Sequence, residues 1–297
     1  MKLFLGVDGG QSGTVALIGD DQGRIVGVGR GARLQDALDV ARVAETVFDS
    51  VCFGLSGGPA GKEALVRELV KSARYFITHD AEIALMGATA GEPGIVMIAG
   101  TGSMAFGRNR ENRTARAGGW GYVFGDEGGA FDLVRQALRA VLRSEEGWGP
   151  RTALSDLLLE STGAGDANQA MHLFYTDEYP RQRVAVLAPL VDRAAALGDA
   201  VAQDILKHAA QSLATFVAAV RRQLFDPAEA VPVSFTGGVF SSKVLLERFR
   251  MLVELEEGNR LIQPHYGPAA GALLEAYRAA GVACELRGLP EEKGAEP

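Results

Sequence analysis

Two glycine-rich segments that also carry hydroxyl side chains could cradle phosphate groups. Each follows an apolar run and leads into a second apolar run, so the chain uses the same pattern twice. Glycine lets the backbone approach a phosphate closely, and Ser or Thr adds hydroxyl donors to the backbone N–H groups. We therefore predict two loops that hold phosphates from opposite sides, with candidate residues Gly9, Gly10, Ser12, Gly13 and Thr14 in the first and Thr101, Gly102 and Ser103 in the second.

An acid precedes the first of these segments. Asp8 ends an apolar run beside Gly9, where it could hold a Mg²⁺ ion that bridges nucleotide phosphates. An isolated Asp-Gly pair would favour a turn aspartate, but the further glycines and hydroxyls shift the balance toward the metal role. A Walker-type loop is excluded because its Gly-Lys-Ser/Thr ending is absent, and a Rossmann fingerprint is excluded because the spacing is wrong.

Asp80 is the candidate general base. It stands between a short apolar run and a helical run, so it could also be a helix N-cap, which is the better interpretation when it is taken alone. A carboxylate at a helix N-terminus beside a phosphate site can accept a proton from a substrate hydroxyl. The neighbouring His79 has no partner in the pattern and predicts a structural or solvated role.

Two further segments are rich in glycine. Residues 118–132 crowd glycines around four aromatic residues and three acids, which indicates a loop lining a polar ligand, with Asp126 accepting hydrogen bonds from hydroxyls. The alternative is a long structural turn in which Asp126 caps the next helix. In the second segment, Gly237-Gly238 ends a predicted strand and leaves room for a flat ring or a ribose, which is a weak signal alone.

The predicted elements that position these residues alternate between strands and helices. Three strands over 2–29 precede further strands and helices, and the pattern begins again near residue 94, which predicts an α/β protein whose two domains meet near residue 93. A polar, charged tail follows the last helix. The expected helices cover about 34–48, 63–73, 81–88, 128–143, 151–162, 183–197, 199–225, 242–251 and 269–280, and the later strands 50–56, 75–78, 94–99 and 231–236.

Composition narrows the class of protein. The 297 residues carry a net charge of −7, which argues against a protein that binds nucleic acid by neutralising phosphates. No apolar run is long enough to span a bilayer, so we expect a cytoplasmic enzyme that does not bind membranes. The two cysteines lack metal-type spacing, and we expect Cys52 to be a buried core thiol, whereas Cys284 could be exposed.

These segments, taken together in this order, resemble the sugar kinases of the N-acetylglucosamine kinase type, in the BadF/BadG/BcrA/BcrD group of the actin-like ATPase superfamily. The resemblance rests on Val7–Thr14, Thr78–Ala81, Ile98–Ser103, Gly118–Gly128 and Thr236–Phe240. It implies two ribonuclease-H-like domains around a cleft that holds Mg-ATP and a sugar. Their expected bounds are 1–93 and 94–265, with the segment from about 266 to 297 packing back on the first domain.

The resemblance also implies roles for individual residues. Asp8 and the loop around Ser12 match the first phosphate and metal site, and the 101–103 loop matches the second. Asp80 takes the place of the catalytic base, which also contacts the sugar. The remaining matches are Gly237, Gly238 and Ser242 at the adenosine site, and Gly119, Trp120, Gly121 and Asp126 at the sugar site.

The chain departs from the family pattern at two places. The segment 29–36 is short and lacks the Asn with which family members touch the sugar, and Met104 stands where the animal enzymes have a polar residue. The sequence therefore predicts an ATP-dependent kinase for an amino sugar, N-acetylglucosamine or glucosamine first, without fixing the sugar. A homodimer stays open.

Two rival functions share the fold. One is an ATPase that energises a partner protein, but the electron-activating members hold an iron–sulfur cluster between subunits, which Cys52 and Cys284 do not match. The other is a catalytically silent sugar sensor, which the presence of Asp80 and the lack of a preceding helix-turn-helix module disfavour. Kinases with a zinc-binding cysteine cluster are excluded by the cysteine count.

Overall fold

The computed structural model describes residues 1–10 and 13–290. The chain divides into two compact units, the first made of 1–96 with 263–297 and the second of 97–262. Each unit contains one five-stranded sheet with helices packed on it. Within the described ranges, no helix has both the length and the apolar character that crossing a bilayer would need.

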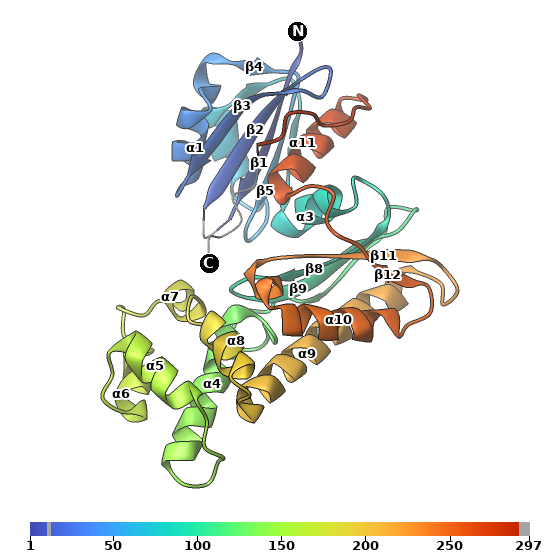
Figure 1. Cartoon of the computed structure of the whole chain (residues 1–297). Coiled ribbons are helices and arrows are strands. Elements are labelled where there is room, and N and C mark those ends of the chain that lie inside the picture. Colours follow the sequence, from blue (N-terminus) through green and yellow to red (C-terminus); the bar gives the residue numbers. More distant parts are fainter. Residues whose placement is uncertain (11–12, 291–297) are drawn as a thin grey trace. The chain divides into compact units, whose positions relative to one another are not determined.

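The sheet of the first unit has the strand order β3-β2-β1-β5-β7 (Figure 1). The first three strands form an antiparallel meander, and β1, β5 and β7 run parallel to one another. Parallel neighbours bring their carboxyl ends to one edge of a sheet, which is where ligands bind in open α/β folds. The strands are β1 (Leu3–Gly9), β2 (Thr14–Asp20), β3 (Ile25–Gly31), β5 (Ser50–Leu55) and β7 (Tyr75–His79).

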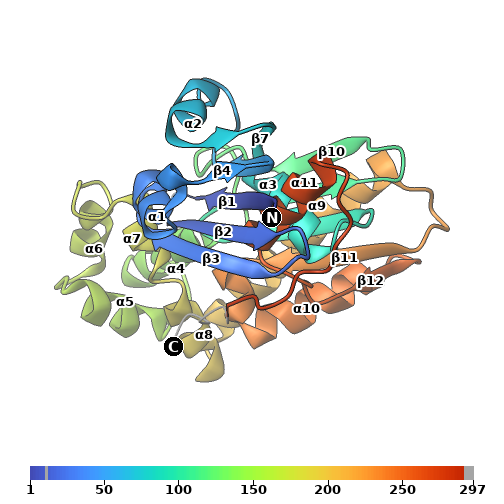
Figure 2. The ribbon, with the colours of Figure 1, turned by 90° about the horizontal axis from the view of Figure 1, so that it is seen from above.

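Alternating residues of β1 divide this unit into two cores. Leu5 and Val7 pack against α1 and α2, whereas Phe4 faces the opposite side and packs against α3 and α11. Figures 1 and 2 show α1 and α11 on the two sides of the sheet. The helix α11 comes from the far end of the chain, and its Tyr277 hydroxyl donates a 2.6 Å hydrogen bond to the Asp20 carbonyl. The helices are α1 (Leu34–Val40), α2 (Glu63–Leu69), α3 (Asp80–Ala88) and α11 (Pro268–Ala279).

The sheet of the second unit repeats this strand order as β10-β9-β8-β11-β12. The long helix α9 (Ala200–Leu224) packs on β9, β10 and α10 (Lys243–Glu254). Phe240 links the ring of Phe235 on β11 to that of Phe249 on α10, at centroid distances of 5.0 and 5.1 Å. The strands are β8 (Gly94–Ala99), β9 (Ser103–Arg108), β10 (Thr114–Gly118), β11 (Val231–Thr236) and β12 (Asn259–Leu261).

A group of helices is inserted between β10 and α9. They gather around α4 at one end of this unit, as Figure 2 shows. This group is α4 (Ala130–Glu145), α5 (Leu154–Thr162), α6 (Ala167–Leu173), α7 (Arg181–Ala185) and α8 (Pro189–Ala196). The insertion lies directly after the 118–129 loop, so its helices can supply side chains to that loop.

Several predicted helices differ from the structure. The helix expected over 34–48 ends at Val40, because Arg42 is left-handed and residues 47–48 form β4, a short strand that pairs with β6 (Lys71–Ser72). The same pairing ends the helix expected over 63–73 at Leu69. The helix expected over 183–197 is two helices, because a proline cannot continue a helix and Pro189 starts α8. The prediction missed α6 and the three-residue strand β12.

Candidate active site

Asp8 lies within a strand, so its interpretation as a turn aspartate is wrong. It occupies the next-to-last position of β1, where it pairs with Val15 of β2 and with Gly54 of β5. Gly54 in turn pairs with Thr78 of β7. Asp8 therefore stands at the carboxyl edge of the parallel part of the sheet, half-buried and directed by the strand rather than by a flexible loop.

Asp80 follows β7 at this same edge. The register places Gly9, Leu55 and His79 in one row, so Asp80 begins one residue beyond it. Two strand spacings of about 4.8 Å each put the backbones of β1 and β7 about 10 Å apart. The two carboxylates that the sequence singled out in this unit are thus brought to one sheet edge.

The side chain of Asp80 does not cap α3. The N-cap is His79, which makes no capping hydrogen bond, and Asp80 is the first helical residue. Its Oδ1 accepts a 2.9 Å hydrogen bond from the N–H of Ala81, and its Oδ2 accepts a 3.0 Å hydrogen bond from the hydroxyl of Ser56. The N-cap alternative is therefore wrong, and the half-buried carboxylate is oriented by a neighbouring hydroxyl.

Ser56 is a site residue that the sequence did not reveal. It follows β5, the strand between the two carboxylates, and its carbonyl accepts a 2.5 Å hydrogen bond from Lys62 Nζ. Its N–H donates to the carbonyl of Gly9 at 3.0 Å, which joins it to the first glycine loop. The signal in the sequence that could have revealed Ser56 is a small hydroxyl residue at the end of a predicted strand.

The first glycine loop joins β1 to β2. Gly10 N–H donates to the Gly13 carbonyl at 3.0 Å, and Thr14 is buried at the start of β2, opposite Gly9. Ser12 lies outside the described residues. The candidate phosphate residues of this unit are thus adjacent to the metal candidate Asp8, as their order in the chain requires.

The second glycine loop rests on the first turn of α4. The carbonyls of Gly100 and Thr101 accept hydrogen bonds from the N–H groups of Ala130 and Phe131, at 2.8 and 3.2 Å. Ser103 is buried, and its hydroxyl donates to the carbonyl of Glu127 at 2.7 Å. The structure therefore gives Ser103 a bracing role, and leaves the half-buried Thr101 and Gly102 as the phosphate candidates of this loop.

Gly237 brings the end of β11 against this second loop. Its φ of 107° is unfavourable for residues with a side chain, and a Cβ there would collide with the Ala99 carbonyl oxygen. Only glycine allows this close approach of two backbones. Gly237 and Gly238 are both exposed, so the two candidate nucleotide segments of the second unit lie side by side and are accessible.

Ser242 has a structural role. Its side chain caps α10, accepting a 3.1 Å hydrogen bond from the N–H of Leu245 and donating a 2.6 Å hydrogen bond to Asp192 Oδ1. Burial raises the pKa of Asp192, and the hydrogen bond from Ser242 opposes this shift. Because its hydroxyl is buried and its proton is already donated, we leave Ser242 out of the adenosine site that the resemblance implied.

The candidate sugar loop exposes its aromatic side chains. The side chain of Trp120 is 65% exposed and that of Phe124 is 85% exposed, and Arg116 Cζ lies 4.7 Å from the Trp120 ring centroid. Gly119 N–H donates to the Ser103 carbonyl, which ties this loop to the second glycine loop. Gly121 accepts two backbone hydrogen bonds that close the turn, from Phe124 and Gly125.

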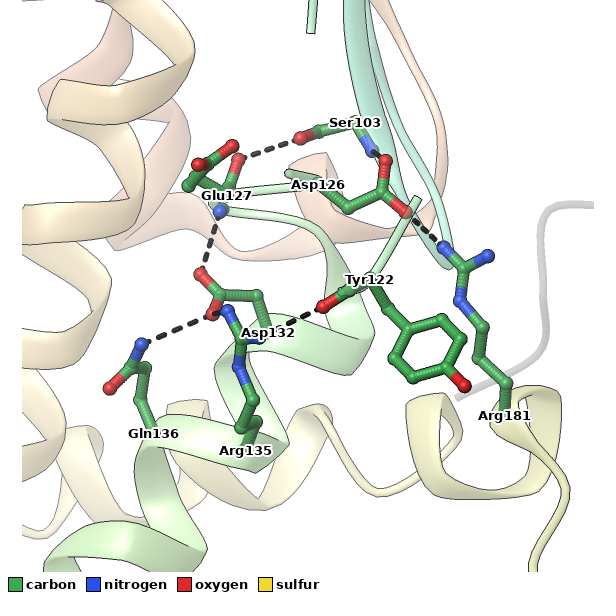
Figure 3. A network of polar contacts seen from close by, with 9 residues as sticks. Ser103, Tyr122, Asp126, Glu127, Asp132, Arg135, Gln136 and Arg181 are labelled. Carbon is green, nitrogen blue, oxygen red and sulfur yellow. Dashed lines mark hydrogen bonds and ion pairs between the residues drawn. The ribbon is translucent and has the colours of Figure 1, made fainter. Parts of the chain in front are cut away.

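Asp126 ends this loop and pairs with an arginine from the inserted helices. It is only 4% exposed, its φ is 63°, and its Oδ2 forms an ion pair with Arg181 Nη2 (Figure 3). It does not cap α4, whose N-cap is Gly129. Asp132 instead accepts the Gly128 N–H at 2.9 Å. The capping alternative for Asp126 is therefore wrong.

The two units thus hold different parts of the predicted site. The first holds Asp8, Asp80 and the glycine turn, and the second holds the 100–102 loop with Gly237–Gly238 and Asp126. In the described part of the chain, no three His, Cys, Asp or Glu side chains gather as a metal cluster. Mg²⁺ in kinases needs only one or two carboxylates beside the phosphates and waters, so Asp8 fits such an ion.

Comparison with known proteins identifies the family. Residues 5–276 match the model of the BadF/BadG/BcrA/BcrD ATPase family. The chain belongs to this family. It is 32% identical over 234 residues to an N-acetylmuramic acid/N-acetylglucosamine kinase of Clostridium acetobutylicum, covering 76% of each chain. It is 30% identical over 311 residues to an N-acetyl-D-glucosamine kinase of Dictyostelium discoideum, covering 93% of this chain and 98% of the relative.

The fold is also that of a solved structure. The crystal structure of a proposed N-acetylglucosamine kinase from Chromobacterium violaceum matches with a TM-score of 0.74 at 26% identity. The match covers 92% of this chain and 98% of that one. The expected actin-like ATPase fold is therefore confirmed.

Proposed function

We propose that this chain is an ATP-dependent kinase that transfers the γ-phosphate of ATP to a hydroxyl of an amino sugar. Membership of the family and the names of the relatives support this class of reaction. The observation that carries it is the strand register, which brings Asp8 and Asp80 to one edge of the sheet, separated by a single strand. N-acetylglucosamine and glucosamine are the first candidates for the acceptor.

Asp80 acts in this proposal as the general base. Its carboxylate accepts the proton of the sugar hydroxyl while that oxygen bonds to the γ-phosphorus and the bond to the leaving ADP breaks. The hydrogen bond from Ser56 fixes the orientation of Oδ2, and the N–H of Ala81 fixes that of Oδ1. A carboxylate has about four acceptor positions, so two remain for the substrate hydroxyl.

Each unit carries candidate nucleotide-binding residues of its own. Gly9, Gly10, Gly13 and the Ser12 position supply the first phosphate loop, and Thr14 supports it at the start of β2. In the second unit Thr101 and Gly102 supply the second phosphate loop, and Gly237–Gly238 supply the adenosine site. Asp8 would hold the Mg²⁺ ion, which when bound neutralises charge that develops on the phosphates.

Sugar recognition falls to the loop that ends at Asp126. The carboxylate accepts hydrogen bonds from sugar hydroxyls, the exposed Trp120 offers an aromatic face to the apolar side of the ring, and Gly119 and Gly121 allow the backbone to approach.

Cys52 is fully buried within β5, as predicted, so it is not placed to share a metal cluster with a second subunit. The kinase is therefore preferred to the partner-driving ATPase.

A coupled assay of ADP release tests the proposal. The purified chain is given Mg-ATP with N-acetylglucosamine, glucosamine, N-acetylmuramate, N-acetylmannosamine or glucose, one at a time. We expect at least one amino sugar to stimulate ADP release strongly over the rate without sugar. ATP hydrolysis that no sugar in the panel stimulates would sink the kinase function and favour the ATPase.

A further inference from the structure

Arg181 lies outside the predicted site and contacts it directly. It is the first residue of α7, in the inserted helices, yet its Nη2 pairs with Asp126 Oδ2, 55 positions earlier in the chain (Figure 3). The same guanidinium lies over the ring of Tyr122, with 5.4 Å between Cζ and the ring centroid. Arg181 thus contacts the acid of the proposed sugar loop and an aromatic residue of that loop.

Asp126 can adopt few other orientations. Its backbone is left-handed, which is uncommon outside glycine, and the N–H of Ser103 lies 3.4 Å from its Oδ1. Gly102 has no side chain, so the carboxylate and the guanidinium can occupy the space beside it. A Cβ at Gly102 would collide with both groups. The ion pair and the second glycine loop therefore fix the carboxylate together.

The energetics make the guanidinium necessary for this arrangement. A buried carboxylate without a partner is strongly destabilised, and removing one partner of a buried pair leaves the other charge uncompensated. The Asp126 side chain is 6% exposed and that of Arg181 is 27% exposed, so the pair is screened little by water. The Arg181 Nε is buried without a hydrogen-bond partner among the described residues, so the ion pair is the main constraint on its head group.

We propose that Arg181 is a positioning residue of the sugar site, which holds the Asp126 carboxylate in the orientation that accepts hydrogen bonds from the substrate. The inference rests on the proposed function, in which Asp126 binds the sugar. Arg181 itself does not contact the reacting atoms. Its partnership couples the inserted helices to sugar recognition.

The test compares steady-state constants of four forms with the wild type: Arg181→Ala, Arg181→Lys, Asp126→Asn and the Arg181→Ala/Asp126→Asn double variant. Losing a hydrogen bond to a charged group should raise KM for the sugar roughly tenfold or more in Arg181→Ala. KM for ATP should rise less than KM for the sugar, because the ion pair holds Asp126, which the proposal assigns to the sugar, although its guanidinium lies beside Gly102 of the second glycine loop. Arg181→Lys, which keeps the charge, should recover part of the sugar affinity.

Two controls separate positioning from a general structural role. Arg183 lies on the same helix and stacks on Tyr179 without contacting Asp126, so Arg183→Ala should leave KM for the sugar unchanged. In the Asp126→Asn background, Arg181→Ala should add less than about twofold, because its effect passes through Asp126. Sugar binding measured by calorimetry without nucleotide gives the same comparison independently of turnover, and the lysine variant serves if the alanine variant does not fold.

The outcomes are distinct. A wild type that no sugar stimulates overturns the proposed function and this inference with it. If the wild type is active and Arg181→Ala leaves KM for the sugar unchanged, only the inference is overturned. It is also overturned if Arg181→Ala raises KM for the sugar equally in the wild-type and the Asp126→Asn backgrounds. A selective loss of N-acetylmuramate, the one panel sugar with a carboxylate, would mean that Arg181 binds the substrate directly, which also overturns a positioning role.

Discussion

The two sheets share one strand order and carry different chemistry at corresponding places. In the first sheet, β1 ends in Asp8-Gly9, and in the second sheet the corresponding strand β8 ends at Ala99, which Gly100 follows. The scaffold therefore presents a loop at the same position twice, but only one copy carries a carboxylate. In the other copy, Gly237 fits against the Ala99 carbonyl, where a side chain would collide.

The strands β5 and β11, which occupy the fourth position in the two spatial strand orders, show the same contrast. The sequence after β5 is Ser56-Gly57-Gly58, and β11 ends in Thr236 before Gly237-Gly238. In the first unit the hydroxyl residue orients the acid of the following helix, and in the second the glycines bring two backbones together. The repeated fold thus provides equivalent edges, and single residue types give the proposed general base to one edge and a close backbone contact to the other.

The largest test of this contrast is Asp80→Asn, which removes the proton acceptor and keeps a hydrogen-bonding side chain of the same shape. We expect turnover to fall roughly 10²–10⁴-fold, the usual worth of general-base catalysis. KM for the sugar should change much less. Turnover above about a tenth of the wild-type rate, in a variant that folds and binds both substrates, would mean that Asp80 is not the base.

Asp8→Asn tests the other carboxylate, which the second sheet replaces by Ala99. Losing one charged group beside a triphosphate should lower the rate about 10²-fold, since charge stabilisation of the transferred group is a large part of such catalysis. Asp21→Asn, at an exposed turn of the same unit, is the matched control and should be neutral. Turnover of Asp8→Asn close to wild type at saturating Mg²⁺ would contradict the metal role and leave Asp8 a strand residue.

The strong periodic elements and the local motifs were predictable, whereas long-range contacts were not. The apolar runs of β1, β5, β8 and β11 ended where glycine or small residues follow, so the strand-end candidates could be named. The helix expected over 34–48 failed because a two-residue strand pairs across the chain, which no local pattern records. Arg181 carries no signal either, because its partner lies in another element and arginine is common in this chain.

A pair of serine-to-aspartate hydrogen bonds sharpens the contrast between the units. Ser56 donates to the proposed base Asp80 in the first unit, and Ser242 donates to Asp192, which has no proposed catalytic role, in the second. Ser56→Ala should lower turnover about tenfold, because a hydrogen bond to a charged group is lost. Ser242→Ala should cost about 1 kcal/mol of stability through the lost helix cap and leave turnover unchanged. A thermal melt and a turnover assay on both variants check this, and a turnover loss confined to Ser242→Ala would reverse the assignment.

The smallest expected effect concerns Asp192 and depends on pH. Burial raises its pKa in the folded state above the ordinary value of 3.8, so the folded chain holds this proton more tightly than the unfolded chain. Its contribution to stability is therefore full below pH 3.8, falls as the pH rises through the raised pKa, and is unfavourable at neutral pH. Asp192→Asn carries no charge to bury, and its amide oxygen can still accept the Ser242 hydroxyl.

We thus expect Asp192→Asn to melt slightly higher than the wild type at pH 7, and the difference to shrink as the pH is lowered through the raised pKa of Asp192, because the wild-type carboxyl then gains a proton in the folded state. Asp177→Asn, at an exposed position of the same unit, is the control for the change in net charge. Melting curves of the three proteins across this range decide the matter. A difference that is absent at pH 7, or that grows as the pH falls, would show that the Ser242 hydrogen bond outweighs burial. Ser242 would then stabilise a charged carboxylate, as Ser56 does, and the two units would differ less than proposed.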